Sequence, residues 1–595
     1  MSSHKSLLPC ALLAAAITFT QPTAAQNQAA APSVKQDSDK TKTQEIEVKA
    51  KSEVENQRRD AAAKSIVSNA DLIRYGDTNI TEAMKRVPGV IVVKGVMQLP
   101  GLNSGYTQIL VDGEPPRGIS INDIPMQSIE RVEIYRLGSA EFSSQGVAGT
   151  INIILKKVPQ SKQNNLTLAL SHETKTTPQI SWTSSDKWDN WSYSITASAR
   201  QYVSSSLGDS HTYERDLKNE PVREYSRADK SEYPIQSFSI NPVIQYRKPD
   251  GFNLKVTSHL LTSDGKNTAR ETYTFQKGDP LPYPHIRRNN QLQDVNSGTT
   301  IKLLDKLGEA TKLDFSINLS GRRSNFRDKD SNFDLQEHLL FARQVYLHEL
   351  ENRVATSLKL TAPSNEEHDI VGGITLSSVN NRNERNQELT VINTPPELIG
   401  DSVKHQATHS VVNNYAAFVQ DEWKFRKESS AYFGLRWENV NVSSEGSEQI
   451  AAQNTSSVWS PIIQTLWQLN SENSDRLRVG VSRTFKAPGN FFLVHPRFVL
   501  PNNSEQNPSV RGNPMLKPEL AWSFEASYEH NDAQEFAYSV KAIVREITDL
   551  HRMQAKIIDQ FWWRQVVNAG DAISKRVDLN IQYLINDFLH TAQSI

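Results

Sequence analysis

The sequence carries none of the short motifs whose spacing marks a catalytic site. It has no P-loop, no glycine-rich dinucleotide fingerprint, no His-Glu-x-x-His zinc motif and no Gly-x-Ser-x-Gly nucleophile elbow. Its single cysteine is Cys10, and a lone thiol forms neither an internal disulfide nor a thiolate metal cluster. We therefore expect a protein that is not an enzyme and holds no cofactor or resident metal.

Docking through backbone hydrogen bonds is a different kind of chemistry, and residues 45–49 are suited to it. The segment alternates polar and apolar side chains, like a strand too short to be stable alone. It is either the first edge strand of the domain that follows or a peptide that adds a strand to the open sheet edge of a partner. Its residues are Glu45, Ile46, Glu47, Val48 and Lys49.

The amino-terminal residues 1–25 have the features of a secretory signal peptide. A short polar start precedes an apolar core at 7–20 and small residues at 23–25. Cleavage would also remove Cys10, so the mature chain would contain no cysteine. Residues 26–60 are polar and have little to bury, which predicts a disordered arm around the docking segment. We therefore expect an exported protein.

Composition excludes two further classes of protein. The chain has 595 residues, a formal charge of −1 and a mean hydropathy of −0.55. It is too polar for a bundle of transmembrane helices, each of which needs about 20 apolar residues. Its near-zero charge gives no basic footprint for nucleic acid. We expect no nucleic-acid partner.

Residues 61–159 predict a compact α/β unit. Asn79 begins a capping box for a short amphipathic helix, and the pair Asp112-Gly113 predicts a tight turn after a strand. In the strand predicted at 129–135, both faces mix apolar and charged side chains. Ordinary burial gives cleaner patterns, so this mixture is typical of a small domain seated inside a polar cavity.

After residue 159 the sequence alternates apolar and polar residues with a period of two, which predicts strands with one apolar face. A soluble β-sandwich or propeller would alternate in the same way. Short connections and long polar ones, which we expect at 203–232, 264–296 and 322–350, favour an outer-membrane barrel instead. So do aromatic residues near the predicted strand ends, where girdles form at the membrane interfaces: Trp188, Trp191, Trp423, Trp437, Trp467, Trp562 and Trp563.

Four blocks in the first unit resemble the plug domain of TonB-dependent outer-membrane receptors. They read AMKRVPGV at 83–90, GYTQILVDG at 105–113, IERVEI at 129–134 and GTINIILK at 149–156. The later segments TFKAP at 484–488 and GNPMLKPE at 512–519 are similar to a pair of late barrel motifs in that family. The plug motif residues carried by the first four blocks are Pro88, Gly89, Asp112, Gly113, Glu130, Arg131, Glu133, Gly149 and Asn152.

The resemblance implies an all-β transmembrane barrel of the 22-stranded type at 160–595, with the small α/β plug domain at 61–159 inside its lumen. It implies that residues 45–49 are a TonB box, the point where the inner-membrane TonB complex (TonB-ExbB-ExbD) docks and delivers energy. It places the chain in the outer membrane of a Gram-negative bacterium, against lipid and lipopolysaccharide. The plug charges Glu130, Arg131, Glu133 and Arg136 would either pair with the barrel wall or be solvated surface charges. Where the family pattern usually has Arg-Gly, this chain reads Pro100-Gly101, which removes a cation.

The resemblance also implies active uptake of a scarce ligand, for which a ferric siderophore is the leading interpretation. Haem, cobalamin, other metal chelates and glycans remain alternatives, and a non-transporting surface adhesin is the alternative from a different class. Haem would use His495 as an axial ligand. Arginines and aromatic side chains suit a bulky anionic chelate. On position, the candidate ligand contacts are Tyr106, Arg117, Arg483, His495 and Arg497.

The number of predicted strands raises a question of completeness. Roughly 16 to 18 alternating segments follow residue 159, at about 9–11 residues for each membrane strand. A 22-stranded ring would need more. The final residues, 587–595, lack a closing amphipathic strand and a terminal aromatic residue. From the sequence we therefore expect a barrel that is incomplete at its carboxyl end.

Overall fold

The computed structural model describes most of the chain from residue 64 to residue 583. Residues 45–49 and the other calls on the first 63 residues lie outside it. The described ranges are 64–77, 79–93, 95–116, 121–124, 126–156, 162–172, 175–216, 218–278, 283–308, 310–363, 367–392, 405–426, 429–447, 451–470, 475–494, 503, 505, 508–531 and 536–583.

The first unit is a small α/β domain around a four-stranded sheet with strand order β1-β5-β6-β4. Asn79 caps helix α3 through a hydrogen bond from the backbone N of Glu82, which confirms the helix start predicted from the sequence. The elements are β1 (Lys64–Ser68), α2 (Asn69–Ile73), α3 (Ile80–Met84), β2 (Ile91–Val93), β3 (Val96–Gln98), β4 (Thr107–Val111), η1 (Ile121–Asp123), η2 (Met126–Ser128), β5 (Ile129–Tyr135) and β6 (Gly149–Leu155).

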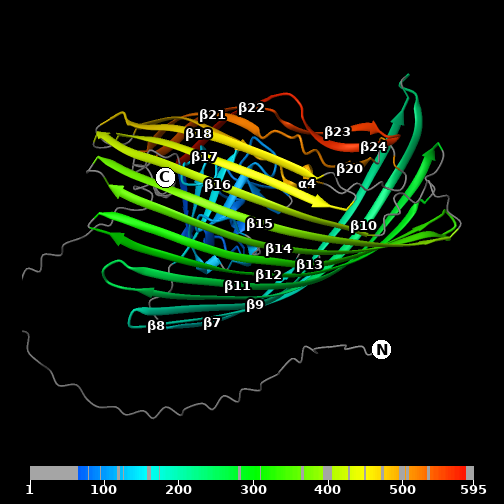
Figure 1. Ribbon diagram of the computed structural model, residues 1–595, viewed down its shortest axis with the longest axis horizontal. Helices are drawn as coiled ribbons and strands as arrows, with labels where there is room; N and C mark the ends of the chain where they lie inside the picture. The colour runs from blue at the N-terminus through cyan, green and yellow to red at the C-terminus, as the bar shows by residue number, and fades with distance from the viewer. Residues whose placement is uncertain are drawn as a thin grey trace, which may run out of the picture. The chain divides into compact units, whose positions relative to one another are not determined.

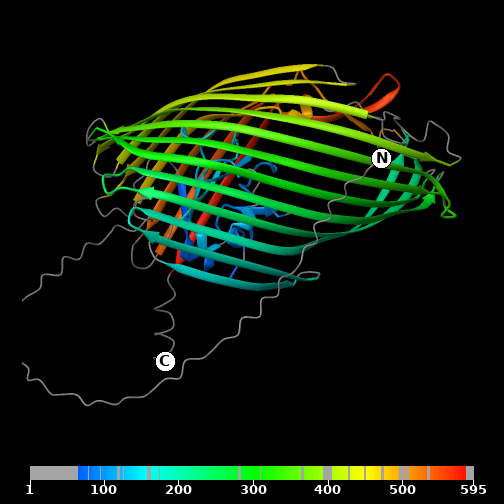
Figure 2. The ribbon, with the colours of Figure 1, turned by 60° about the horizontal axis from the view of Figure 1, so that its bottom comes forward.

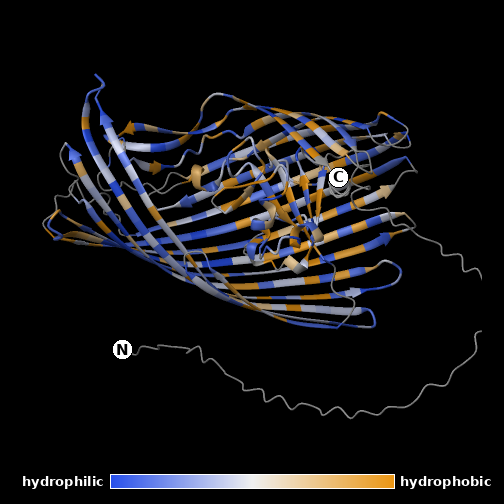
Figure 3. Ribbon diagram, turned by 180° about the vertical axis from the view of Figure 1, so that it is seen from behind, coloured by the Kyte–Doolittle hydropathy of each residue, from blue (hydrophilic) through white to orange (hydrophobic). Residues whose placement is uncertain are grey.

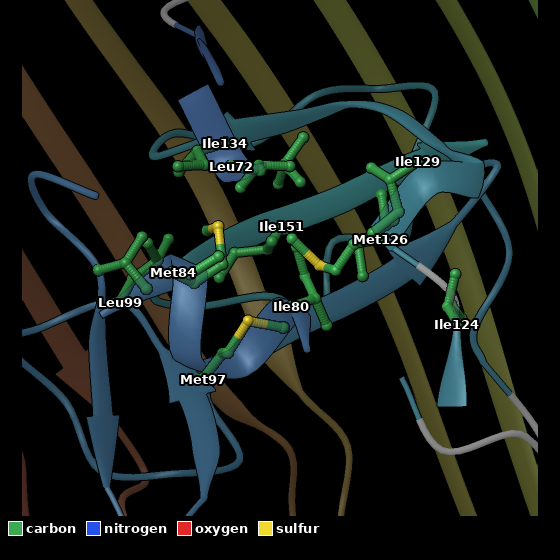
Figure 4. Packing of buried hydrophobic residues seen from close by; sticks show 14 of the residues in the cluster. Leu72, Ile80, Met84, Met97, Leu99, Ile124, Met126, Ile129, Ile134 and Ile151 are labelled. Carbon is green, nitrogen blue, oxygen red and sulfur yellow. The ribbon is translucent and has the colours of Figure 1, made fainter. Parts of the chain in front are cut away.

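This domain has a hydrophobic core of its own. Leu72 from α2 and Met84 from α3 pack with Ile129 and Ile134 from β5 and Ile151 from β6 (Figure 4). All five side chains are almost completely buried. The residues of this core all belong to the domain itself.

A tight turn fixes the carboxyl end of β4, and a glycine fixes the start of β6. Asp112 and Gly113 both have positive φ, at 49° and 85°, as the turn predicted at this pair requires. The turn is held to β6, because the backbone N of Gly113 donates to Oδ1 of Asn152 at 2.9 Å. Gly149 begins β6 with φ 123°, and a Cβ there would lie 2.3 Å from the carbonyl oxygen of Tyr135. Only glycine fits that position.

The remaining strands form one antiparallel sheet of 16 strands, in the order β25-β22-β21-β19-β18-β17 and then consecutively down to β7 (Figures 1 and 2). Sixteen is the lower end of the number predicted from the alternating segments and falls short of the 22 implied by the family resemblance. The first eight strands are β7 (Gln163–His172), β8 (Thr176–Trp188), β9 (Trp191–Arg215), β10 (Pro221–Arg247), β11 (Asn253–Lys277), β12 (His285–Leu307), β13 (Thr311–Phe333) and β14 (Leu339–Pro363).

The rest of the chain contributes the other eight strands of this sheet and a separate three-stranded sheet with the order β20-β24-β23. No helix among the described residues is long and apolar enough to cross a membrane. The elements are β15 (His368–Val391), β16 (His405–Arg426), β17 (Ser429–Gly446), β18 (Ala452–Gln468), β19 (Asp475–Lys486), α4 (Asn490–Leu493), β20 (Ser509–Arg511), β21 (Glu519–Asn531), β22 (Phe536–Thr548), β23 (His551–Ile558), β24 (Phe561–Asn568) and β25 (Ala572–Tyr583).

Hydrophilic and hydrophobic residues alternate along the strands of the large sheet (Figure 3), as predicted from the sequence. Because successive side chains of a strand point to opposite faces, the two faces differ in polarity. Exposed apolar residues such as Leu319, Phe433 and Ile463 belong to one face. We call this the outward face, because residues of the opposite, inward face bond to the first domain, which we call the plug. Trp188 and Trp467 lie near strand ends and are exposed, as expected for interface aromatics, whereas Trp563 is completely buried in β24.

The prediction of long polar connections at 203–232, 264–296 and 322–350 is wrong. Most of these residues continue the strands, so β10 reaches 27 residues and β11 25 residues. At about 3.3 Å per residue, such strands far exceed the length that crosses a bilayer. Polar side chains on both faces had indicated loops, but continuous pairing such as that between Glu232 and Thr268 shows that the ladder bonds extend into the polar region.

We predict that replacing Gly149 with alanine destabilises the plug far more than replacing Gly76. Both glycines have positive φ, but a Cβ at Gly76 meets no atom within 4 Å. Gly76→Ala should therefore cost about 1 kcal/mol of backbone strain and Gly149→Ala about 3 kcal/mol or more. The measurement is the urea concentration at which trypsin begins to cleave the plug. Equal cleavage profiles for the two variants would contradict the steric role of Gly149.

Candidate functional site

Tyr106 lies where the plug meets the inward face of the sheet. Its hydroxyl donates to Oε1 of Glu519 at 3.0 Å, and Nζ of Lys486 lies 3.8 Å from the centroid of its ring. Burial, and then the charge of Glu519, raise the pKa of the Tyr106 phenol. An aromatic ring, a cation and a carboxylate from three separate segments therefore meet here.

Glu519 connects this meeting point to the segment that leads into β23. Its Oε1 also accepts a hydrogen bond from the backbone N of His551 at 2.6 Å, and its side chain is completely buried. The second oxygen, Oε2, is buried and has no hydrogen-bond partner among the described residues. The buried Glu519 carboxylate is therefore held by Tyr106 of the plug and by the backbone of His551. Its Oε2 atom accepts no hydrogen bond from the described residues.

A second contact joins the plug segment at 138–144 to strands β17 and β18. Glu438 accepts hydrogen bonds from Oγ of Ser143 and from the backbone N of Ser144, each at 2.7 Å. Arg436 donates to the carbonyl of Ala140 at 3.1 Å and pairs with Glu438 at 3.3 Å. Both wall residues are at least 97% buried, with exposed fractions of 3% and 1%. The pair therefore has these hydrogen bonds to the plug only while the plug segment is in place.

Strands β22 and β25 hold a third part of the plug. Arg545 donates to the carbonyls of Arg136 and Ala148 at 3.1 Å and 3.0 Å. Arg576 donates to the carbonyl of Pro100 at 3.2 Å, and Ser574 donates to the carbonyl of Gly101 at 3.0 Å. At the position where the family pattern has a plug arginine, the wall therefore supplies the cation.

The predicted plug motif residues are mostly structural. Asp112, Gly113 and Asn152 form the turn that fastens β4 to β6. Gly89 has φ 80°, and the preceding carbonyl, that of Pro88, accepts a hydrogen bond from Arg136. These residues shape the plug and do not themselves meet at Tyr106.

The expected pairing of Glu130, Arg131 and Glu133 with the barrel wall is wrong. Arg131 pairs with Glu130 at 2.5 Å and with Glu133 at 2.9 Å, and the hydroxyl of Tyr135 donates to Glu133. Residues one and two positions apart on β5 satisfy one another, because their long side chains reach along the strand. Burial lowers the pKa of Arg136, a further plug cation, although the charge of Glu525 on the wall acts in the opposite direction.

The structure describes two of the five candidate ligand contacts, Tyr106 and Arg483, and does not bring these two together. Arg483 belongs to β19, donates to the carbonyl of Trp459 at 3.3 Å and lies 5.9 Å from the ring of Trp522. Its neighbours Ser482 and Thr484 are buried on the inward face, so Arg483 is on the outward face, away from Tyr106. Arg117, His495 and Arg497 lie outside the described residues. Within the described ranges no group of three metal-ligating side chains occurs.

Sequence reasoning missed the wall residues that hold the plug, among them Lys359, Arg436, Glu438, Lys486, Glu519 and Arg545. A signal was present, because Leu435 and Trp437 mark the outward face of β17 and thereby place Arg436 and Glu438 inward. Alternation predicts which face of the sheet a side chain lies on, but not which plug residue it contacts. The partner depends on strand register and on the plug loop opposite.

Two family models match the chain. The one described as "TonB dependent receptor-like, beta-barrel" matches residues 244–592, and the one described as "TonB-dependent Receptor Plug Domain" matches residues 56–150. The first match covers more than half of the chain and most of the large sheet. The second covers most of the plug, including β4, the Asp112-Gly113 turn that follows it, and β5.

Individual proteins agree with this assignment. The chain is 24% identical over 514 residues to the "Iron-regulated outer membrane virulence protein" of Vibrio cholerae, a match that spans 82% of this chain and 66% of that relative. The fold is similar to that of the siderophore receptor PirA from Pseudomonas aeruginosa, at 17% identity and a TM-score of 0.56, covering 87% of this chain and 81% of PirA.

The ferric enterobactin receptor PfeA from Pseudomonas aeruginosa is similar at 14% identity and a TM-score of 0.59, covering 88% of this chain and 78% of PfeA. At these identities, the solved structures establish the fold. The structure has a plug domain and a 16-stranded antiparallel sheet whose inward residues bond to the plug. The barrel family model matches residues 244–592. The chain therefore belongs to the family of TonB-dependent outer-membrane receptors.

Proposed function

We propose that the protein binds a ferric siderophore at the cell surface and transports it inward with energy from the inner-membrane TonB complex (TonB-ExbB-ExbD). The names of its relatives support an iron cargo: one is an iron-regulated outer-membrane protein, and two similar structures are siderophore receptors. Iron enters this account as cargo and not as a resident cofactor.

The observation that carries the proposal is the kind of contact between plug and wall. The main apolar core of the plug consists of plug residues alone. Its attachment to the wall includes two small apolar clusters, around Ala140 and Val147, and many hydrogen bonds, such as those of Glu438 and Arg545. Water can replace polar contacts at modest net cost, while apolar burial is lost entirely on exposure. A plug attached in this way can separate from the wall while keeping its own fold.

Energy input requires a segment of the receptor to which the TonB complex can bind. Residues 45–49 have the place and pattern of a TonB box, and the first described strand, β1, starts only at Lys64. The box would add a strand to TonB, and a pull along the chain would act first on β1, which pairs with β5. Cargo outside can favour this step only if it binds the box-exposed state more tightly than the box-hidden state.

The meeting point at Tyr106 suits an anionic chelate. Lys486 supplies a positive charge at the ring face, and aromatic and cationic side chains together favour bulky anions with extended π-systems. Cobalamin is the second candidate, because the chain is also 28% identical over 134 residues to the vitamin B12 transporter BtuB of Vibrio vulnificus.

Deleting residues 45–49 should abolish uptake and leave surface binding of the cargo intact, because the segment is needed for energy and not for recognition. Proline at Ile46 or Val48 should have the same effect, since it removes a ladder hydrogen bond to the partner strand. The measurement is uptake of labelled cargo beside binding to whole cells. A proline at Gln36, in the same arm, is the control and should transport normally. Wild-type uptake by the deletion variant would contradict the TonB box assignment.

The cargo is identified by growth under iron limitation of a strain whose only receptor of this family is this chain. We expect growth on one or more ferric siderophores, and weaker binding of that siderophore when Lys486→Gln removes the cation beside Tyr106. Haem and cobalamin-dependent growth form the other arms of the panel. Growth on haem alone, lost in His495→Ala, would overturn the siderophore proposal and favour haem.

A further inference from the structure

The inward face of β14 carries a buried arginine that lacks an anionic partner among the described residues. Arg353 is 8% exposed, and its Nε and Nη1 atoms are buried without a hydrogen-bond partner in that part of the chain. Val354, the next residue, is 51% exposed on the outward face, so Arg353 points inward. A buried charge without a counter-charge destabilises a folded protein. A bound anion would remove that cost.

The residues that adjoin Arg353 in the sheet do not neutralise its charge. Across the ladder it lies opposite Ser320 on β13 and Val379 on β15, and neither side chain is charged. Glu351 is two residues away on the same face of β14. That carboxylate lies opposite Arg322 and interacts with the Arg322 side chain instead. The sheet around Arg353 therefore supplies a cation and withholds its partner.

Arginines on the inward face of the neighbouring strands have acidic partners. Arg322 on β13 binds Asp294 at 3.1 Å, and Arg288 on β12 binds Glu271 at 2.6 Å. These pairs show that carboxylates are available on this face of the sheet. The missing partner is thus a property of Arg353 and not of inward arginines in general.

Arg353 lies at the height of the plug. Lys359, further along the inward face of the same strand, pairs with Glu141 of the plug at 2.5 Å. Arg353 is about ten residues from the end of β14 that meets the short connection to β15, and Glu438 is about nine from the corresponding end of β17, so the two are nearly level. Glu438 binds the plug directly. Arg353 therefore belongs to the boundary between plug and wall.

We propose that Arg353 binds an anionic oxygen group of the cargo while the cargo passes between the plug and the wall. A guanidinium offers paired N–H donors that match the oxygens of carboxylate, catecholate and phosphate groups. The site is separate from the contact at Tyr106, whose partners lie on β19 and β21, because the strands β15 to β18 separate β14 from β19. The proposal rests on the proposed function and narrows it to a cargo that carries negative charge.

The first measurement uses inorganic phosphate as a small free anion. Purified full-length receptor is heated in sodium phosphate and in sodium chloride at equal ionic strength, so that general screening is the same in both. The test variant is Arg353→Gln. The matched control is Arg322→Gln, which removes the same charge from the same face of the neighbouring strand but breaks the pair with Asp294.

Phosphate should raise the thermal midpoint of the wild type by about 1–2 °C relative to chloride. Arg322→Gln should keep that shift and be less stable than the wild type, because Asp294 loses its partner. Arg353→Gln should lose the shift and be at least as stable as the wild type in chloride. A wild type without the shift would overturn the proposal. So would an Arg353→Gln receptor that keeps the shift or is destabilised as much as Arg322→Gln.

The second measurement separates cargo from free anions. Cells expressing each receptor are given labelled ferric citrate, ferric enterobactin or an uncharged ferric tris-hydroxamate. Arg353→Gln should bind each chelate as the wild type does and take up the anionic ones at least about fivefold more slowly, with Arg353→Lys in between.

Equal uptake by Arg353→Gln and the wild type, or wild-type uptake confined to the uncharged chelate, would overturn the assignment of Arg353 to cargo. Wild-type uptake of none of the three would count against the proposed function and the cargo assignment together. The phosphate response decides independently whether Arg353 is an anion site, so the two failures are distinguishable.

Discussion

A peptide group in lipid has no water to bond to, and the rest of this structure depends on that constraint. Strands in lipid must therefore bond to neighbouring strands. The described residues form one antiparallel sheet of 16 strands, in which every strand except β7 and β25 has a neighbour on both sides. Period-two alternation then separates two environments along every strand. The outward face is apolar where lipid touches it, and the inward face is free to carry the charges that hold the plug.

The plug and the wall divide the stabilising interactions between them. Burial of residues such as Ile80, Met84 and Ile151 stabilises the plug internally. Buried polar residues of the wall, with Arg436 and Glu438 foremost, determine where the plug sits. Buried ion pairs give position more reliably than net stability. A domain that has its own apolar core and is positioned largely by polar contacts suits a channel that must be closed at rest and opened under load.

The sequence predicted those features that depend on neighbours along the chain. Alternation predicted the strands, Asn79 the start of α3, and Asp112-Gly113 the turn after β4. It failed where the outcome depends on residues far apart in the chain. Polar segments expected to be loops became strand extensions, because each found a partner strand to bond to.

Charge pairing shows the same limit at the candidate site. Glu130 and Glu133 were expected to reach the wall, but Arg131 beside them satisfies both. Tyr106 was predicted to contact the ligand from its position alone, and this stays a prediction. The structure adds the two side chains that contact Tyr106, Lys486 and Glu519. Those two residues are far from Tyr106 in the chain, so no local pattern pointed to them.

The central claim is that the plug must part from the wall during transport, and a reversible cross-link tests it. A Cβ at Gly138 would lie 3.5 Å from Cβ of Ser482, within the range that a disulfide spans. The chain's one other cysteine, Cys10, lies in the predicted signal peptide. Oxidised Gly138→Cys/Ser482→Cys receptor should bind cargo normally and not transport it, with transport restored by reductant and unaffected in either single variant. Normal transport by the fully cross-linked receptor would contradict the account.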